Sequence, residues 1–419
     1  MGAKSGSFVN RAKKLEEAIN TFDPERALLT PEELDAFFVD RGKGPLEETK
    51  ILLTESFTPQ KILFTGHRGS GKSTELARLA HSLKESFFIV FFSAEEILDL
   101  RDINYLDIIL TMAMELFRRA AEEGLRLNRK LMEDIHAWFR ETFKEVEVTV
   151  SKGQGVSAGL KAYFVGLEGK LEREAVTRRL IREKVEPRLS QLLERLNLLI
   201  GDVGRKAGRR VLIIVDDLDH ADLKVAKELF YEHGAALSQP ECHLIYTFPI
   251  ALRHDNDFIQ MREGFADLLP VLPNFRLCDE EGNPDEGGRR LLRELVLKRA
   301  EEVLFEEAAL EQLVNQSGGL TRQLVRLVRL AALEALMAER DRITADDVEE
   351  AVSRLRQDYE VLLDSKQREA LRRVRETKRV ENDELHRSLL HNLSVLEYRN
   401  RHLWYDVNPI VTPLLEERS

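Results

Sequence analysis

The strongest constraint on how this chain folds is a glycine-rich stretch that joins a strand to a helix. An apolar run at residues 62–64 predicts a short buried strand, and residues 75–80 have the composition of a helix. Between them lie Gly66, four further residues, and then Gly71 and Lys72. Glycines at this spacing let the backbone curl so that its N–H groups, at a helix N-terminus, face phosphate oxygens. The order of strand, loop and helix therefore predicts a phosphate-binding loop.

The loop and the first turn of the following helix supply the expected nucleotide contacts. Lys72 would lie against the β- and γ-phosphates and the Ser73 hydroxyl would ligate Mg²⁺, so ATP with Mg²⁺ is the expected ligand. The alternative is a glycine-rich turn that precedes a helix by accident, and the flanking strand and helix argue against it. The residues expected to bind nucleotide are Gly66, His67, Arg68, Gly69, Ser70, Gly71, Lys72, Ser73 and Thr74.

A second apolar run, at residues 211–215, ends in Asp216 and Asp217. Open α/β sheets bind their ligands at the carboxyl ends of strands, where these acids would lie. We expect Asp216 to contact Mg²⁺ directly or through water, and Asp217 to act as the catalytic base that polarises the attacking water. Asp219, two residues further on, is also suited to cap a helix.

Two further residues are candidates for the catalytic site. Thr247 lies near the tip of the apolar strand predicted at residues 243–248, where its hydroxyl would contact the γ-phosphate or the water; an ordinary strand threonine is the alternative. Arg322 would open a helix just after Gly318 and Gly319, where the helix dipole disfavours a positive side chain. That cost favours a contact with a nucleotide phosphate over a solvated arginine.

The remaining pattern divides the chain into parts. Continuous apolar runs, such as the one at residues 87–92, are typical of parallel strands covered on both faces. A weaker run with Pro273 predicts an edge strand. Inside a helical insertion, Val146 and its neighbours alternate with polar residues, and the alternation of Val156, Ala158, Leu160, Ala162 and Phe164 after two glycines predicts a hairpin. The predicted parts are an N-terminal helix (1–28), a core (29–278) with an insertion at about 104–200, a helical lid (289–362) and a last module (366–419).

Composition restricts the function classes. The formal net charge of −11 argues against a broadly basic protein that coats nucleic acid, although residues 366–419 contain eleven Lys and Arg against nine Asp and Glu. Cys242 and Cys278 lack the spacing of a zinc site or a disulfide framework and fit a reducing cytosol, so we expect a cytoplasmic protein. The charged start predicts no signal peptide, and the longest apolar run is too short to span a bilayer.

These residues together resemble an AAA+ P-loop ATPase of the initiator-like (origin-recognition) or STAND type. Residues 66–73 correspond to Walker A, 211–217 to Walker B, Thr247 to sensor 1 and 318–322 to sensor 2 of the lid. The resemblance implies an α/β fold with a five-stranded parallel sheet, a helical lid and a C-terminal winged-helix-like module. It also implies ATP hydrolysis that changes assembly as a homo-oligomer, on DNA through 366–419, or on a protein partner.

Two departures from the family pattern refine this expectation. Most members carry Glu where this chain has Asp217, so hydrolysis is expected to be slow; the alternative is a nucleotide-gated DNA-binding or scaffold protein with negligible turnover. An arginine finger is not assigned, and Arg253 and Arg262 are the candidates. Phe38 and Val39 are candidates for contact with the base. The order of motifs excludes an ABC protein, the missing guanine motif argues against a GTPase, and the long helical C-terminus fits a small-molecule kinase poorly.

Overall fold

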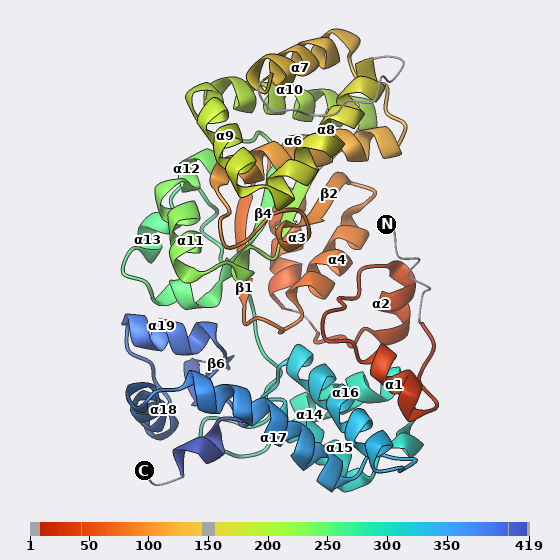
Figure 1. The fold of residues 1–419 in the computed structure, drawn as a ribbon, viewed down its shortest axis with the longest axis vertical. Coiled ribbons are helices and arrows are strands. Elements are labelled where there is room, and N and C mark those ends of the chain that lie inside the picture. The colour runs from red at the N-terminus through yellow and green to blue at the C-terminus, as the bar shows by residue number, and fades with distance from the viewer. Residues whose placement is uncertain (1–8, 43, 145–155, 401, 417–419) are drawn as a thin grey trace.

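The computed structural model describes residues 9–42, 44–144, 156–400 and 402–416. An α/β core lies in the middle of the molecule, with a helical insertion at one end and the lid and C-terminal module at the other (Figure 1). Within the described ranges, no helix combines the length and the apolar character needed to cross a bilayer.

The core is a sheet of five strands that all run parallel, in the order β2-β3-β4-β1-β5. β4 lies between β1 and β3, and the three strands run in the same direction. The glycine loop after β1 and the acids after β3 therefore lie at the same edge of the sheet, one on each side of β4. Both residues of β5 pair with the last two residues of β1, and the strand stops before Pro273, as an edge strand does. The predicted five-stranded parallel fold is confirmed. The strands are β1 (Lys61–Gly66), β2 (Phe87–Ser93), β3 (Arg210–Asp216), β4 (His243–Pro249) and β5 (Val271–Leu272).

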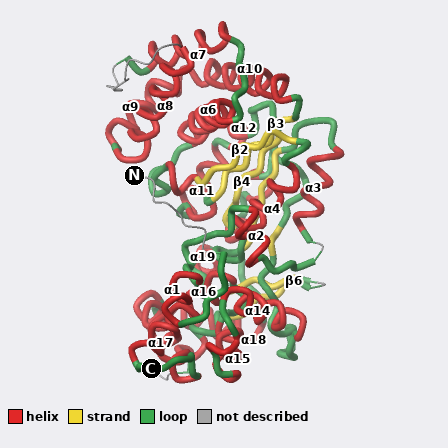
Figure 2. Tube along the Cα trace, turned by 90° about the vertical axis from the view of Figure 1, so that its right-hand side faces the viewer, coloured by secondary structure: helices red, strands yellow, loops and turns green. Residues whose placement is uncertain are grey.

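Both faces of the sheet are covered, which explains the uninterrupted apolar strands (Figure 2). Ile62 and Phe64 of β1 pack with α3 (Pro45–Glu55) and α4 (Lys72–Leu83). Leu63, on the opposite face, belongs to a larger cluster shared with the insertion. The preceding helices are α1 (Leu15–Thr21) and α2 (Pro31–Phe37), and α5 (Ala94–Ile97) follows β2.

The insertion consists of helices throughout its described part. The predicted hairpin is wrong for its second arm, because residues 156–173 form a helix; Val146, Val148 and Val150 of its first arm lie outside the described residues. Leu160, Phe164, Leu167 and Leu171 are all buried at a spacing of three or four residues, so helical periodicity decides the structure. Leu160 and Phe164, four residues apart, satisfy both the alternation and the helical period. The helices are α6 (Tyr105–Glu122), α7 (Arg129–Thr142), α8 (Val156–Arg173), α9 (Ala175–Val185) and α10 (Leu189–Ala207).

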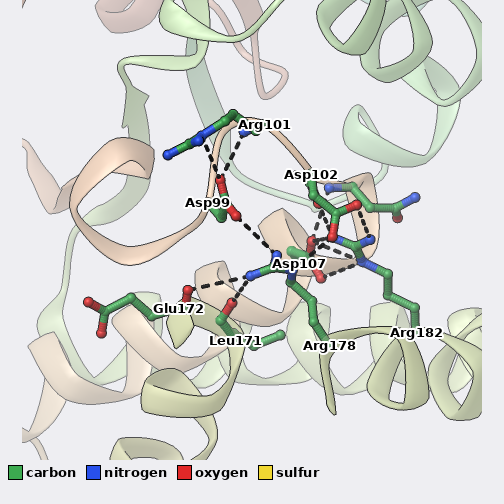
Figure 3. Close-up of polar contacts among 9 residues, drawn as sticks. Asp99, Arg101, Asp102, Asp107, Leu171, Glu172, Arg178 and Arg182 are labelled. Carbon is green, nitrogen blue, oxygen red and sulfur yellow. Dashed lines mark hydrogen bonds and ion pairs between the residues drawn. The ribbon is translucent and has the colours of Figure 1, made fainter. Parts of the chain in front are cut away.

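An ion-pair network fastens the insertion to the core. Arg178 and Arg182 of α9 reach across to the segment between α5 and α6 (Figure 3). Arg178 Nη2 lies 3.2 Å from Asp99 Oδ2, and its Nε lies 3.1 Å from Asp102 Oδ2. Arg182 donates to Asp102 and to Asp107, whose carboxylate is fully buried and also accepts from the Asn104 N–H at the start of α6.

The rest of the chain forms the lid and the C-terminal module. Two short helices precede β4 in the sequence, α11 (Leu223–Lys227) and α12 (Gly234–Leu237). A 3-10 helix, η4 (Ile250–His254), and the short helix α13 (Phe258–Met261) follow it. The lid helices are α14 (Glu286–Arg299), α15 (Glu307–Gln316), α16 (Thr321–Met337) and α17 (Ala345–Leu362). The module consists of α18 (Ser365–Thr377), α19 (Glu384–His391) and an antiparallel hairpin of β6 (Val395–Arg399) and β7 (Leu403–Val407).

Candidate nucleotide site

A cavity opens where the core, the N-terminal segment and the lid meet. One part of its wall is the phosphate loop with the start of α4, and next to it lie acids that follow β3. The opposite part comes from the segment between α1 and α2 and from the lid. The residues of the candidate site that line it are Gly69, Gly71, Lys72, Ser73, Thr74, Asp217, Asp219 and Arg322.

The loop after β1 has the shape that its glycines permit. Gly69 has a φ of 77°, and a Cβ there would lie 2.6 Å from the Cβ of Arg322. A Cβ on Gly66 would lie 2.7 Å from the Leu272 carbonyl oxygen. α4 begins at Lys72, so the first N–H groups of this helix have no carbonyl partner within it. The residues that carry these groups line the cavity, and N–H groups at a helix start can bind an anion.

Lys72 is held by a third acid. Its Nζ lies 2.9 Å from Asp219 Oδ2 and donates to the carbonyl oxygens of Gly66 and His67. Burial would raise the pKa of Asp219, but the Lys72 ammonium outweighs it and lowers that pKa. Asp219 therefore stays ionised against Lys72, a role that differs from the helix cap considered for it.

The acids after β3 form a crowded negative group. Burial, together with the charges of Asp217 and Asp219, raises the pKa of Asp216 to about 7. The Ser73 hydroxyl and the Asp217 N–H donate to Asp216 and act in the opposite direction. Hard cations prefer oxygen ligands, and a cation bound here would neutralise part of the negative charge of these three acids. The chemistry of Ser73 and Asp216 therefore fits Mg²⁺.

Asp217 and Thr247 are placed differently from one another. Asp217 lines the cavity with a φ of 63°, and its Oδ2 accepts a hydrogen bond of 2.5 Å from Ser93 at the end of β2. Thr247 is fully buried, and its hydroxyl accepts from the Leu218 N–H at 2.9 Å. Its side chain thus holds the turn that carries Asp217 and does not line the cavity.

The lid contacts the phosphate loop directly. The Arg322 N–H donates to the Gly69 carbonyl oxygen at 2.9 Å, and the Arg322 side chain lines the cavity. Arg41 lies between loop and lid, where it donates to the Ser70 carbonyl at 2.5 Å and to the Thr321 hydroxyl at 3.2 Å. Sequence reasoning missed Arg41, because no motif surrounds it and its partners are far away in the chain.

His67 and Arg68 of the loop do not line the cavity. Arg68 donates to the His220 carbonyl at 3.1 Å. His67 Nε2 accepts from the Glu397 N–H of β6 at 2.7 Å, so the C-terminal module contacts the phosphate loop itself. Burial lowers the pKa of His67 to about 4 and keeps the ring neutral. Ser70 is also buried and outside the lining, so any nucleotide contact of His67 or Ser70 would come from the backbone.

The expected finger and base residues have other partners. Arg253 Nη1 donates to the buried carboxylate of Glu397 at 2.6 Å, and Arg262 donates to the Asp267 carbonyl. Phe38 lies under the Arg78 guanidinium, and Val39 belongs to the lid core. The cavity is lined instead by Phe37 and by the segment between α1 and α2, which showed no recognisable motif in the sequence. Phe38 and Val39 are therefore not the residues that line it.

This geometry defines the class of the protein. The sheet is parallel, and one cavity is lined by the glycine loop after β1, by acids that follow β3 and by an arginine of the lid. This arrangement is a P-loop nucleotide-binding fold. Residues 51–231 match the family model of the AAA ATPase domain. This match confirms the predicted resemblance to AAA+ P-loop proteins.

Several solved structures are similar along most of the chain. Cdc6p from Pyrobaculum aerophilum is 13% identical, with 95% of this chain and 97% of that chain covered and a TM-score of 0.41. ORC2 from Aeropyrum pernix is 13% identical, with coverages of 95% and 96% and a TM-score of 0.44. The RuvB branch migration motor from Thermotoga maritima is 15% identical, with coverages of 93% and 98% and a TM-score of 0.38. No curated protein matches the sequence.

Proposed function

We propose that this chain binds ATP with Mg²⁺ and hydrolyses it slowly, and that the nucleotide state changes how the lid and the C-terminal module sit on the core. One observation carries the proposal. A single cavity is lined by the N-terminus of α4, by Lys72, by the acid Asp217 and by Arg322 of the lid. These are the groups that a triphosphate and its attacking water need, and they come from separate parts of the chain.

The residues would divide the work as follows. The N–H groups at the start of α4 and Lys72 bind the β- and γ-phosphates, for which Lys72 must leave Asp219. Arg322 neutralises charge on the γ-phosphate from the lid side. Asp217 orients a water whose oxygen attacks the γ-phosphorus; the bond to the β–γ bridging oxygen breaks, and the proton of the water passes to Asp217. Thr247 fixes the turn that presents Asp217.

Mg²⁺ would be held by the Ser73 hydroxyl and by Asp216. When bound, the ion neutralises charge that develops on the β- and γ-phosphate oxygens. The protein's own contribution is to keep these two ligands adjacent and to bury Asp216, which is only 3% exposed.

The resting contacts of the site support slow turnover. Lys72 is paired with Asp219, and Asp217 is bound by Ser93, so both must exchange partners before hydrolysis. The side chain of Asp217 is also shorter than that of glutamate, which increases the distance between its carboxylate and the water that attacks the γ-phosphorus. The same contacts favour the second candidate, a nucleotide-gated DNA-binding or scaffold protein with negligible turnover.

Replacement of Lys72 tests the proposal. Lys72→Ala is expected to lower ATP turnover by about 100-fold or more, because a preorganised cation on the transferred phosphoryl group is lost. Lys84→Ala, at the exposed residue directly after the same helix, is the matched control. Turnover is measured as phosphate release, and binding by calorimetry. If Lys72→Ala binds and hydrolyses ATP like the wild type, the proposed function is wrong.

A second experiment separates the enzyme from the switch. If the protein is a slow ATPase, Asp217→Asn should still bind ATP but lose the slow turnover of the wild type. If it is a nucleotide-gated switch, the wild type itself should show negligible turnover. Addition of duplex DNA at two salt concentrations tests the partner: a steep loss of binding with salt would indicate phosphate contacts through residues 366–419. Particle mass with ATP, with ADP and without nucleotide tests the proposed homo-oligomer, and an unchanged mass and no DNA effect favour a protein partner.

A further inference from the structure

The nucleotide cavity has two chemically different ends. The phosphate loop and the acids form one end, and the proposed triphosphate occupies it. The other end contains apolar groups that suit the faces of a base, together with the charged side chains of Asp23, Arg26 and Glu33. The apolar groups are Ala27, Leu28, Phe37 and Val325. Arg299, the last residue of α14, also lines the cavity, from the lid helix that packs beside α2.

Arg299 is a buried cation without a matching anion. It is 7% exposed, and burial lowers its pKa to about 10. Its Nη1 donates to the Leu295 carbonyl at 3.3 Å, and the guanidinium lies 5.6 Å from the centre of the Phe37 ring. Across the described ranges, no carboxylate forms an ion pair with Arg299. A guanidinium has five N–H donors, and one long hydrogen bond leaves most of them for a ligand.

The acids at this end of the cavity have other partners. Glu33 pairs with Arg26 and accepts from the N–H groups of Leu29 and Thr30 at the start of α2. Asp23 accepts from Arg329 at 2.8 Å. Among the described residues, neither of these acids is therefore the partner of Arg299, and the guanidinium donors that do not bond the Leu295 carbonyl are available to a ligand.

The position of Arg299 is fixed by its backbone. Its carbonyl accepts from the Ala12 N–H at 2.8 Å, which ties the end of α14 to the N-terminal segment. A cation in the last turn of a helix is also stabilised by the helix dipole, and this accounts for why the site tolerates a buried arginine. The dipole alone gives no reason for this side chain to line the nucleotide cavity.

We propose that Arg299 is the residue that recognises the base, by donating a hydrogen bond to a ring nitrogen of a purine. This inference rests on the proposed nucleotide-binding function and adds its specificity. A purine carries ring nitrogens N1, N3 and N7, and those without a proton accept from a guanidinium. Because Arg299 is only 7% exposed, the hydrogen bond is made in a largely buried site and discriminates strongly against a base that lacks the acceptor.

Deaza analogues test the proposal at a single atom. The affinities of wild type and Arg299→Met are measured for ATP, for 1-deaza-, 3-deaza- and 7-deaza-ATP, and for inorganic triphosphate. We expect one analogue to bind the wild type about 10- to 100-fold more weakly than ATP does. Arg299→Met should lose that discrimination, bind ATP correspondingly more weakly, and bind inorganic triphosphate as the wild type does. Arg293→Met, on the same helix but paired with surface acids, is the matched control.

The outcomes are distinct from failure of the proposed function. If the wild type binds neither ATP nor triphosphate, the nucleotide site itself is wrong. If ATP binds but all three analogues bind equally well, or Arg299→Met weakens ATP and triphosphate alike, base recognition by Arg299 is wrong. Arg299→Lys, which retains charge and a donor, should recover part of the discrimination; thermal unfolding of each variant confirms that it is folded.

Discussion

The helical insertion and the C-terminal module are attached to the same core in different ways. The insertion is fastened by arginines of α9 to acids in the segment before α6, and Asp99 and Asp102 are partly open to water (Figure 3). The module is fastened by its strand β6 to the phosphate loop, where His67 accepts from the Glu397 N–H. None of the acids or arginines in the first attachment lines the nucleotide cavity, whereas the second includes a loop residue.

The difference indicates which part of the molecule is coupled to nucleotide. Glu397 is bound through its backbone by His67 and through its side chain by Arg253, which follows the strand that carries Thr247. A shift of the loop or of β4 must therefore move β6. The insertion can change its position without such a shift, so its changes should alter stability and leave ATP affinity unaltered.

The largest effect is expected from Glu397→Ala. It leaves the half-buried Arg253 without its carboxylate, and loss of one partner of a buried pair costs about 3–5 kcal/mol of unfolding free energy. The variant keeps the backbone N–H from which His67 accepts, but without the pair with Arg253 the strand β6 is held less firmly against the phosphate loop. ATP affinity should therefore fall by roughly 3- to 10-fold through the cost of ordering the loop. Urea unfolding and calorimetry measure the two effects. Glu381→Ala, exposed in the same module, is the control, and wild-type stability of Glu397→Ala would contradict the coupling.

The pH dependence of stability is a second test of the contact between His67 and Glu397. Burial holds the pKa of His67 at about 4, below the usual 6.5, so its stabilising contribution is complete above pH 6.5 and is lost as pH falls through 4. The full loss is roughly 3 kcal/mol, of which about 2 kcal/mol falls between pH 7 and pH 5. His67→Gln should therefore lose less stability than the wild type over that interval. Exposed His81→Gln is the control, and parallel pH curves for wild type and His67→Gln would contradict the prediction.

Local patterns predicted the sheet and the phosphate loop well. Apolar runs mark β1 to β4, and the glycines before Lys72 are required by contacts that a Cβ would violate. Helix starts also carry local signals, since Thr344 forms a capping box with Asp347 three residues later. The hairpin failed because the alternation of Leu160 and Phe164 is compatible with helical spacing as well.

The parts of the site that sequence could not predict are contacts between distant segments. His67 and Glu397 are 330 residues apart, and no periodic pattern relates them. The pair of Lys72 and Asp219 depends on the turn after β3, which places the third acid rather than the first against the lysine. Arg299 lies outside any motif, and only the packing of α14 beside α2 brings it to the cavity.

The insertion should respond to Arg182→Met with a smaller effect. Buried Asp107 loses its cation, but it keeps the Asn104 N–H and can take up a proton, since burial already raises its pKa. We expect a loss of about 2 kcal/mol in unfolding free energy and unchanged ATP affinity. Arg179→Met, exposed on the same helix, is the control. A change in ATP affinity would show that the two attachments are not independent.

The smallest effect is expected from Asp99→Asn. Its carboxylate lies 3.2 Å from Arg178 Nη2 with 37% of the side chain exposed, and such pairs contribute about 0.2–1 kcal/mol. Because exposed charges are screened, the loss should be measurable in urea unfolding at low salt and vanish at about 0.5 M salt, where the Debye length is a few ångströms. Arg178 keeps its hydrogen bonds to Asp102 and to the Leu171 carbonyl, so α9 remains attached. A loss above about 2 kcal/mol, or one that persists in high salt, would mean that the network is desolvated as a whole, and the contrast with the buried attachment of β6 would then disappear.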